Sequence, residues 1–238
     1  MSNSNLGDGI SAKNAAWTFD GKEVAHSFDT HVKKSVPLYK EGQEMIVRMS
    51  DFFIDEFSNI FDIGCSTGVL TRKLSKRHAH KSAKVIGIDT SAEMIKIARE
   101  STKEIKCEYL IEDAAEVEMH GSDLITAYYT VQFVRPHKRQ QLIDKIYADL
   151  RWGGAFFMFE KVRACDARFQ DIISTTYIEY KQGQGYSDEE ILGKQMSLKG
   201  ILEPFSTEGN IEMLTRAGFK DITTIFKYAP FEGFLCVK

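Results

Sequence analysis

The chain has 238 residues, 43% of them apolar and 27% charged, as is usual for one globular domain with its own core. Its net charge of −3 disfavours nucleic acid as a partner, because phosphate binding needs a basic surface. No apolar stretch is long enough to span a bilayer, and the first residues lack the apolar core of a signal peptide. We therefore expect a cytoplasmic protein that binds neither membranes nor nucleic acid.

The cysteines are few and stand far apart in the sequence. No two of them form a Cys-x-x-Cys pair, so the sequence indicates neither a zinc site nor a redox motif, and we expect no metal. Reduced structural thiols are the prediction for Cys65, Cys107, Cys165 and Cys236.

Periodic apolar residues predict a helix over residues 41–57, followed from residue 59 by alternating strands and helices. Such alternation is typical of a single α/β domain with a largely parallel sheet. Residues 219–238 predict a closing hairpin around Pro230. The other predicted strands are 59–64, 84–89, 107–113, 123–134 and 153–161, and the predicted helices are 68–77, 91–101 and 138–150.

Residues 162–206 interrupt this alternation after the fifth strand. They predict one or two helices with a glycine-rich break. An insertion at the carboxyl end of a strand often covers an active site. A surface helix pair without a role explains the same pattern, and both interpretations stay open.

The stretch FDIGCSTG, residues 61–68, places two glycines between a buried strand and a helix. Ligands of doubly wound sheets bind at such strand ends. Gly64 allows a sharp turn, and the helix start offers free N–H groups to a dinucleotide, a phosphate or an amino-acid carboxylate. Val69 after Gly68 excludes a P-loop, and Ser66 replaces the second glycine of a dinucleotide fingerprint.

Acidic residues follow at the ends of the next two predicted strands. Asp89 lies 21 residues after Gly68, at the end of the strand where a carboxylate accepts hydrogen bonds from ribose hydroxyls. The third strand ends at Asp113 and Ala114, where a side-chain acceptor and a backbone N–H can read an adenine edge. Three neighbouring strand ends together predict an adenosine-binding site.

The motifs DIGCSTG, GID and IED resemble those of the class I S-adenosylmethionine-dependent methyltransferases. This resemblance implies a Rossmann-like α/β fold with a seven-stranded, mostly parallel sheet whose last strand is antiparallel. It also implies S-adenosylmethionine as the cofactor. The glycine turn would face its methionine half, Asp89 its ribose and Asp113 its adenine.

A narrower resemblance runs along nearly the whole chain, with WTFD at 17–20, SVPLY at 35–39, FEK at 159–161 and GYSDEEI at 185–191. These stretches are similar to the carboxy-S-adenosylmethionine synthases, which make a carboxymethyl donor for a tRNA wobble uridine. The resemblance implies a homodimer and an N-terminal flap, residues 1–40, with Trp17 and Phe19 folded over the cofactor. It implies cofactor contacts at Tyr39, Gly64, Cys65, Ser66, Asp89, Thr90, Asp113 and Ala114.

The sequence departs from this branch at the residue that binds the carboxylate added to the sulfonium. Gln195, in KQMS, stands in place of the branch's arginine, and a glutamine amide forms no bidentate charge pair with a carboxylate. Tyr128 replaces an asparagine at the end of the fourth strand, and Thr90 replaces another. The changes at Gln195 and Tyr128 disfavour carboxylated-cofactor chemistry, whereas that at Thr90 is milder, and the ordinary S-adenosylmethionine site stays intact.

Aromatic and polar side chains near the expected site are the candidates for catalysis. An aromatic face attracts a desolvated sulfonium by about 1–2 kcal/mol through cation–π interaction. We expect this role, and a cofactor contact, for Tyr128, whereas Tyr129 and Phe133 are expected to pack in the sheet. In the insertion, Tyr177 and Gln195 are the candidates for contact with an acceptor.

These features predict a methyltransferase that uses S-adenosylmethionine on a small molecule in secondary metabolism. A carboxy-S-adenosylmethionine synthase that binds its product differently is one alternative. In another, the cofactor's own amine attacks its γ-carbon, giving methylthioadenosine and azetidine-2-carboxylate. A cofactor-binding regulatory protein with a dead site also stays open, while the incomplete glycine fingerprint disfavours a nicotinamide oxidoreductase.

Overall fold

The computed structural model describes residues 4–8, 11–12, 17–103 and 105–238. Seven strands of this part of the chain form one sheet in the order β5-β4-β3-β6-β7-β9-β8. The pairs from β5 to β7 are parallel, and β9 is antiparallel to both of its neighbours, which confirms the predicted sheet. The strands are β3 (Asn59–Ile63), β4 (Lys84–Asp89), β5 (Glu108–Ile111), β6 (Ser122–Tyr128), β7 (Leu150–Lys161), β8 (Asp221–Tyr228) and β9 (Phe231–Val237).

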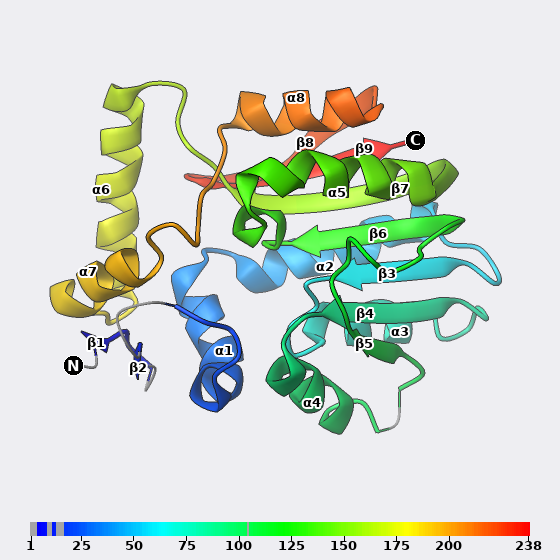
Figure 1. The fold of residues 1–238 in the computed structure, drawn as a ribbon, viewed down its shortest axis with the longest axis horizontal. Helices are drawn as coiled ribbons and strands as arrows, with labels where there is room; N and C mark the ends of the chain where they lie inside the picture. The colour runs from blue at the N-terminus through cyan, green and yellow to red at the C-terminus, as the bar shows by residue number, and fades with distance from the viewer. Residues whose placement is uncertain (1–3, 9–10, 13–16, 104) are drawn as a thin grey trace.

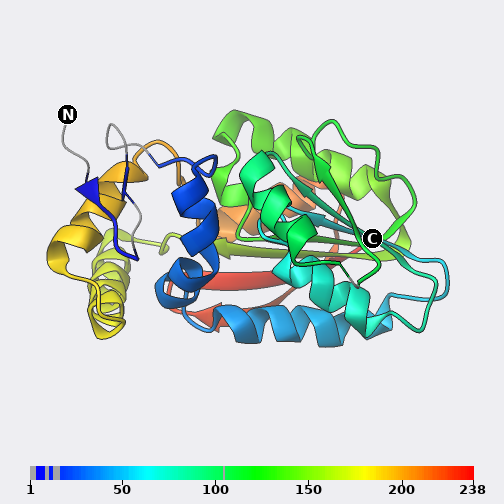
Figure 2. The ribbon, with the colours of Figure 1, turned by 90° about the horizontal axis from the view of Figure 1, so that it is seen from below.

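Helices cover both faces of this sheet (Figures 1 and 2). Figure 2 shows α2 and α3 on one face and α5 and α8 on the other. The described helices are α1 (Lys22–Ser35), α2 (Tyr39–Met49), α3 (Val69–Arg77), α4 (Ala92–Glu100), α5 (Pro136–Asp149), α6 (Ala167–Gly183), α7 (Asp188–Ser197) and α8 (Thr207–Ala217). None of the helices that the structure describes is long and apolar enough to cross a membrane.

Alternation along the strands explains these two layers, because successive side chains of a strand point to opposite faces. Phe156 and Met158 of β7 pack with α5 and α8, whereas Phe157 and Phe159 pack with α2 and α3. Both sets are fully buried, so the strand is apolar throughout its centre. This pattern fixes the register of the central strands and thereby the positions of their carboxyl ends.

The insertion forms two helices, α6 and α7, which stand beyond the carboxyl ends of the central strands at the left of Figure 1. The short strand β1 (Ser4–Asn5) pairs with β2 (Ser11–Ala12) and lies against α7. Helix α6 has 17 residues, all of them described, and none is buried. The prediction of one or two helices over residues 162–206 is confirmed, and α6 contacts the core through Tyr177, whose ring meets Phe231 of β9 edge-on at 5.3 Å between centroids.

The two largest errors in the predicted boundaries have local reasons. The strand predicted over residues 123–134 ends at Tyr128, because Tyr129 adopts a left-handed φ of 61° and the chain turns into a short 3-10 helix, η3 (Val131–Phe133). The helix predicted over residues 41–57 ends at Met49 and continues only as a 3-10 turn. There the Ser50 hydroxyl donates a hydrogen bond to the Val47 carbonyl and competes with the helical pattern.

Candidate active site at the carboxyl ends of the strands

A cavity of about 920 Å³ lies between the carboxyl ends of the strands and the helices α1, α6 and α7. The structure brings every sequence-predicted site residue to its wall. From the strand ends and α2 come Tyr39, Gly64, Cys65, Ser66, Asp89, Thr90, Asp113, Ala114 and Tyr128, and from the insertion come Tyr177 and Gln195.

The turn after β3 has a left-handed residue at every second position. The φ angles are 66° at Gly64, 54° at Ser66 and 74° at Gly68. A Cβ atom on Gly64 would overlap the side chain of Thr130, so the glycine is needed for space as well as for conformation.

Ser66 stands at the position of the second glycine of the dinucleotide fingerprint and adopts the left-handed conformation that a glycine takes more easily. The turn therefore forms although the fingerprint is incomplete in sequence. Three N–H groups of this turn donate within the protein: Cys65 N to the Ile88 carbonyl at 3.0 Å, Ser66 N to Asp89 at 2.8 Å and Gly68 N to the Cys65 carbonyl at 2.9 Å.

Asp89, at the end of β4, is held in place by two backbone N–H groups. Its Oδ2 accepts from Ser66 N at 2.8 Å, and its Oδ1 accepts from Ser91 N at 2.9 Å. Burial raises the pKa of Asp89, and these hydrogen bonds oppose the rise. A carboxylate offers about four acceptor sites, so two stay available to a ligand. Asp113 is exposed at the cavity rim, where its Oδ1 accepts from Ala115 N at 3.0 Å.

Asp62 is a cavity residue that the sequence interpretation did not select. It is buried in β3 under the glycine turn, where it accepts hydrogen bonds from Thr71 Oγ1 at 2.6 Å and Thr126 Oγ1 at 2.8 Å. Burial raises its pKa to about 6. The signal that could have found it is an acid inside an otherwise apolar strand, since such an acid is rarely buried without a purpose.

Three tyrosines form an aromatic wall, defined here as Tyr39, Tyr128 and Tyr129. The ring of Tyr39 meets Tyr128 edge-on at 4.9 Å between centroids and stacks on Tyr129 at 6.0 Å. The Tyr128 hydroxyl donates to the Tyr39 carbonyl at 2.6 Å. Burial raises the pKa of all three phenols, so each stays protonated at neutral pH.

Tyr129 packs in the core as predicted, but it also lines the cavity. Its hydroxyl is buried and has no hydrogen-bond partner among the described residues. A buried hydroxyl without a partner is costly, so this group is a candidate ligand contact that the sequence did not reveal.

The insertion residues are placed differently from one another. The Tyr177 hydroxyl donates to the Ser35 carbonyl at 2.7 Å and so joins α6 to the end of α1. Gln195 lies on α7 at the cavity, with an exposed side chain. Lys161 at the end of β7 lines the cavity and its neighbour Glu160 does not. Adjacent residues of a strand point in opposite directions, so the two side chains lie on opposite faces of the sheet.

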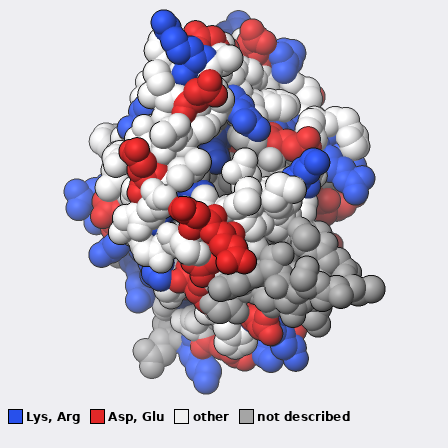
Figure 3. Space-filling view, turned by 90° about the vertical axis from the view of Figure 1, so that its left-hand side faces the viewer, with Lys and Arg blue, Asp and Glu red and all other residues white. Residues whose placement is uncertain are grey.

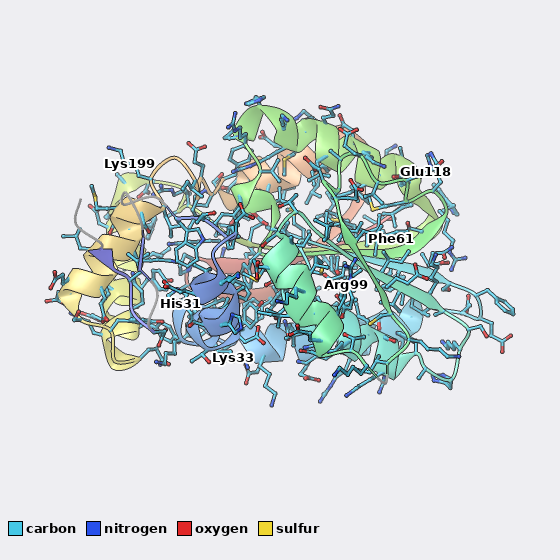
Figure 4. All side chains as sticks on the ribbon, turned by 60° about the horizontal axis from the view of Figure 1, so that its bottom comes forward. His31, Lys33, Phe61, Arg99, Glu118 and Lys199 are labelled. Atoms are coloured by element: carbon cyan, nitrogen blue, oxygen red, sulfur yellow. The ribbon has the colours of Figure 1, made fainter. Side chains whose placement is uncertain are left out.

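The N-terminal segment contacts both α7 and the cavity. Trp17 N donates to the Ser197 carbonyl at 2.9 Å, and the Trp17 ring stacks on His31 at 5.8 Å between centroids. His31 lies on the side of α1 that faces the insertion, whereas Lys33 points away (Figure 4). Phe19 meets Phe133 edge-on at 4.9 Å. Trp17, Phe19 and Phe133 all line the cavity, so this segment forms part of its wall.

Residues 60–154 match the model of a family described as "Methyltransferase domain". A curated relative from Staphylococcus epidermidis, named carboxy-S-adenosyl-L-methionine synthase, is 36% identical over 93% of this chain and 97% of its own length. A relative of the same name from Nautilia profundicola is 38% identical over 91% of this chain and 93% of its own length.

Solved structures share the fold at much lower identity. An O-methyltransferase family protein from Burkholderia thailandensis gives a TM-score of 0.67 at 11% identity, over 91% of this chain and 60% of that one. Human N-acetylserotonin methyltransferase in complex with S-adenosylmethionine gives 0.63 at 14% identity, over 92% of this chain and 57% of that one. The cavity, the strand-end residues and these likenesses agree: this S-adenosylmethionine-dependent transferase of class I methyltransferase fold belongs to the family of the carboxy-S-adenosyl-L-methionine synthases.

Proposed function

We propose that the enzyme transfers the methyl group of S-adenosylmethionine to a small molecule that binds in the same cavity, in secondary metabolism. The observation that carries this proposal is the size of the cavity. A volume of about 920 Å³ lies near the top of the range of about 300–1,000 Å³ for sites that enclose one drug-sized ligand. The cavity therefore has room for the cofactor and for a second small molecule.

The strand ends fit the cofactor in three places. The turn at Gly64–Gly68 lets a ligand approach the backbone closely, which suits the methionine half, and the free acceptor sites of Asp89 suit the ribose hydroxyls. Asp113 and Ala114 stand at the next strand end, where the adenine would lie. Cys65, Ser66 and Thr90 complete this half of the cavity wall.

S-adenosylmethionine supplies an electrophilic methyl carbon on a positively charged sulfur. The residues of this chain align the reactants and exclude water. Tyr39, Tyr128 and Tyr129 are neutral aromatic groups beside the glycine turn, which suits them to hold a sulfonium by cation–π attraction. Tyr177 and Gln195 approach from the insertion and would contact the acceptor.

A second candidate reaction takes the cofactor as the substrate itself. The names of the relatives, carboxy-S-adenosyl-L-methionine synthase, favour carboxylation of the cofactor, whereas the departures from that branch at Tyr128 and Gln195 favour ring closure. In carboxylation the methyl carbon of the sulfonium loses a proton and bonds to the carbon dioxide that prephenate releases as it loses hydroxide, and the hydroxide takes up the proton. The alternative is that the α-amine of the cofactor closes a ring. In ring closure the amine nitrogen bonds to the γ-carbon, the carbon–sulfur bond breaks, and the amine proton passes to water. The products are azetidine-2-carboxylate and methylthioadenosine.

The mass of the nucleoside product distinguishes these reactions. Purified enzyme is incubated with S-adenosylmethionine alone, with added prephenate, and with a panel of small acceptors. We expect S-adenosylhomocysteine, formed only with an acceptor. Methylthioadenosine above the spontaneous background from the cofactor alone would establish ring closure, and a carboxylated sulfonium with prephenate would establish the synthase reaction. Either result would overturn methyl transfer as the main activity.

We also propose that the enzyme is a homodimer formed through α6 and α7. All of α6 is unburied in the single chain, and large apolar side chains on both helices are exposed. Exposed apolar patches of this kind mark protein interfaces. The exposed residues outside the cavity wall are Phe169, Ile172 and Leu192, whereas Ile178 and Met196 are exposed where they line the cavity.

A cytoplasmic location is part of the same proposal. It is supported by Cys65, Cys107, Cys165 and Cys236, all described and all free thiols. The cytoplasm keeps thiols in this state.

A further inference from the structure

Helix α1 presents one face to the cavity. The residues of α1 that line it, spaced as residues that share a helix face, are Phe28, Asp29, His31, Val32 and Ser35. Asp29 is the only carboxylate among them, and every residue of α1 is described. Figure 3 views the molecule from the side of α6 and α7, where the surface is hollowed and acidic (red) and basic (blue) side chains lie around the hollow. A carboxylate on a largely apolar cavity wall calls for a partner.

The half-buried Asp29 side chain is joined to the glycine turn by one hydrogen bond. Its Oδ1 accepts from Thr67 Oγ1 at 2.6 Å, and Thr67 is buried within the turn. Arg72 Nη1 donates to the Thr67 carbonyl at 2.7 Å, which ties the turn to α3. Within the described part of the chain, no lysine or arginine forms an ion pair with Asp29, and its Oδ2 accepts no hydrogen bond. The carboxylate therefore reaches the turn with acceptor sites free for a ligand.

The charge of Asp29 also acts on the aromatic wall. Burial raises the pKa of Tyr39, and the negative charge of Asp29 raises it further, with a smaller contribution from Asp62. Such an effect requires Asp29 to lie near the Tyr39 hydroxyl. The glycine turn suits the methionine half of the cofactor, and the aromatic wall suits its sulfonium. Asp29 is thus close to both features, and its charge is opposite to that of the groups expected there.

The other carboxylates of the cavity wall are less suited to the amino group of the methionine half. Asp89 ends β4, where it suits the ribose, and both of its oxygens accept backbone N–H groups. Asp62 is buried beneath the turn, and each of its oxygens accepts a threonine hydroxyl. Asp29 differs from both, because its Oδ2 accepts no hydrogen bond. The acids that follow β5 lie two strand spacings from β3, or roughly 10 Å away, and are Glu112, Asp113 and Glu116.

We propose that Asp29 binds the α-ammonium group of S-adenosylmethionine. This inference rests on the proposed function, because it uses the placement of the methionine half at the glycine turn. A hydrogen bond between an ammonium and a carboxylate is roughly twice as strong as one between neutral groups. Asp29 therefore selects ligands that carry the amine over nucleosides that lack it. Because Asp29 belongs to α1 and Thr67 to the turn, this contact also joins the ligand to the N-terminal part of the cavity wall.

Calorimetry with two ligands that differ only in the amino group tests this contact. The first is S-adenosylhomocysteine, and the second is S-adenosyl-4-thiobutyrate, which has a hydrogen atom in place of the amine. Asp29→Asn keeps an oxygen that can accept from Thr67 and removes the charge, whereas Asp221→Asn changes an exposed acid that does not line the cavity. We expect the parent to bind S-adenosylhomocysteine about tenfold more tightly than the thiobutyrate. Asp29→Asn should lose this preference by weakening S-adenosylhomocysteine alone, and Asp221→Asn should keep it.

The remaining outcomes separate the possible failures. If the parent binds both ligands equally tightly, the protein does not recognise the amine and the inference is wrong, a result that depends on no variant. If Asp29→Asn, verified as folded by circular dichroism, weakens both ligands equally or neither, Asp29 does not bind the amine; the inference is then overturned and the proposed function survives. If the unsubstituted protein does not bind S-adenosylhomocysteine, the proposed function fails first.

Discussion

Replacement of Gly64 should lower the stability of the whole protein. A Cβ atom there would overlap Thr130 and would hold a non-glycine residue at a φ of 66°. We expect Gly64→Ala to lower the free energy of unfolding by about 2–4 kcal/mol, from backbone strain and overpacking together. Urea denaturation measures this change.

Gly121 provides a matched control, because its φ is 73° and no atom lies within 4 Å of the place that a Cβ atom would occupy. Gly121→Ala should cost only the backbone term, about 1 kcal/mol. Equal losses of unfolding free energy in Gly64→Ala and Gly121→Ala would show that a Cβ atom at position 64 does not overlap Thr130.

Asp62 should make stability depend on pH. Its pKa of about 6 in the folded chain exceeds the value of about 3.9 in an unfolded chain. Between these values the folded state holds a proton that the unfolded state has lost, so stability falls as the pH rises from 4 to 6. The total loss is about 3 kcal/mol, and it persists above pH 6.

Asp62→Asn should remove this decline. Relative to the unsubstituted protein, its free energy of unfolding should rise by about 3 kcal/mol between pH 4 and pH 7, as measured by urea denaturation. Asp221→Asn, at an exposed position, should show no such trend. A constant difference between Asp62→Asn and its parent at all pH values would contradict the buried, protonated state of Asp62.

Site residues were predictable where their position along the chain carried the information. Gly64, Asp89 and Asp113 follow strands, and parallel strands end at one edge of a sheet, so their meeting followed from sequence. Asp62 and the Tyr129 hydroxyl were not selected, because their importance depends on burial. The cavity-lining Lys181 and Lys194 were missed for a related reason, because only the packing of α6 and α7 places them at the cavity.

At the scale of elements, α7 is fixed at its start by a capping box. The Ser187 hydroxyl accepts from Glu190 N, and the Glu190 carboxylate accepts from Ser187 N at 2.9 Å. Ser187→Ala should cost about 1 kcal/mol of helix stability. Because exchange reports the free energy of local opening, this loss should make the amides of α7, the helix that carries Lys194 and Gln195, exchange about fivefold faster.

Ser82→Ala serves as the control for this variant, since Ser82 is exposed and lies in the turn before β4. It should leave exchange in α7 unchanged. Unaltered exchange in Ser187→Ala would mean that the helix is held by its packing against the N-terminal segment rather than by its cap.

Elements with strong periodicity were predicted well, and their ends were not. Strands β3 and β4 and the final hairpin agree with the sequence interpretation, and β7 ends where predicted but begins at Leu150 rather than at Gly153. The end of β6 was misplaced because Tyr129 and Val131 favour strands by type, whereas the left-handed turn at Tyr129 is stabilised by tertiary contacts, including Tyr129 N donating to the Phe159 carbonyl at 2.8 Å.

At the scale of the whole molecule, the exposed face of α6 and α7 should control oligomeric state. Ile172 is 56% exposed on this face. If the face is buried between two copies, Ile172→Glu places a charge in an apolar interface and should convert the dimer to a monomer at micromolar concentration. Sedimentation equilibrium measures the mass directly.

Phe52→Glu is the matched control, because Phe52 is also a highly exposed apolar residue but lies in the turn after α2. This variant should remain dimeric. A monomeric parent protein, or a dimer unaffected by Ile172→Glu, would contradict an interface through the insertion.

The binding of S-adenosylhomocysteine to Asp89→Ala tests most directly whether the strand ends form the cofactor site. The comparison uses calorimetry on the parent, Asp89→Ala and the exposed Asp221→Ala, with circular dichroism to verify folding. If Asp89 accepts two charge-assisted hydrogen bonds from the ribose, as proposed, their loss should weaken binding about a hundredfold in Asp89→Ala, and Asp221→Ala should show no change. A folded Asp89→Ala protein that binds as tightly as its parent would contradict the site.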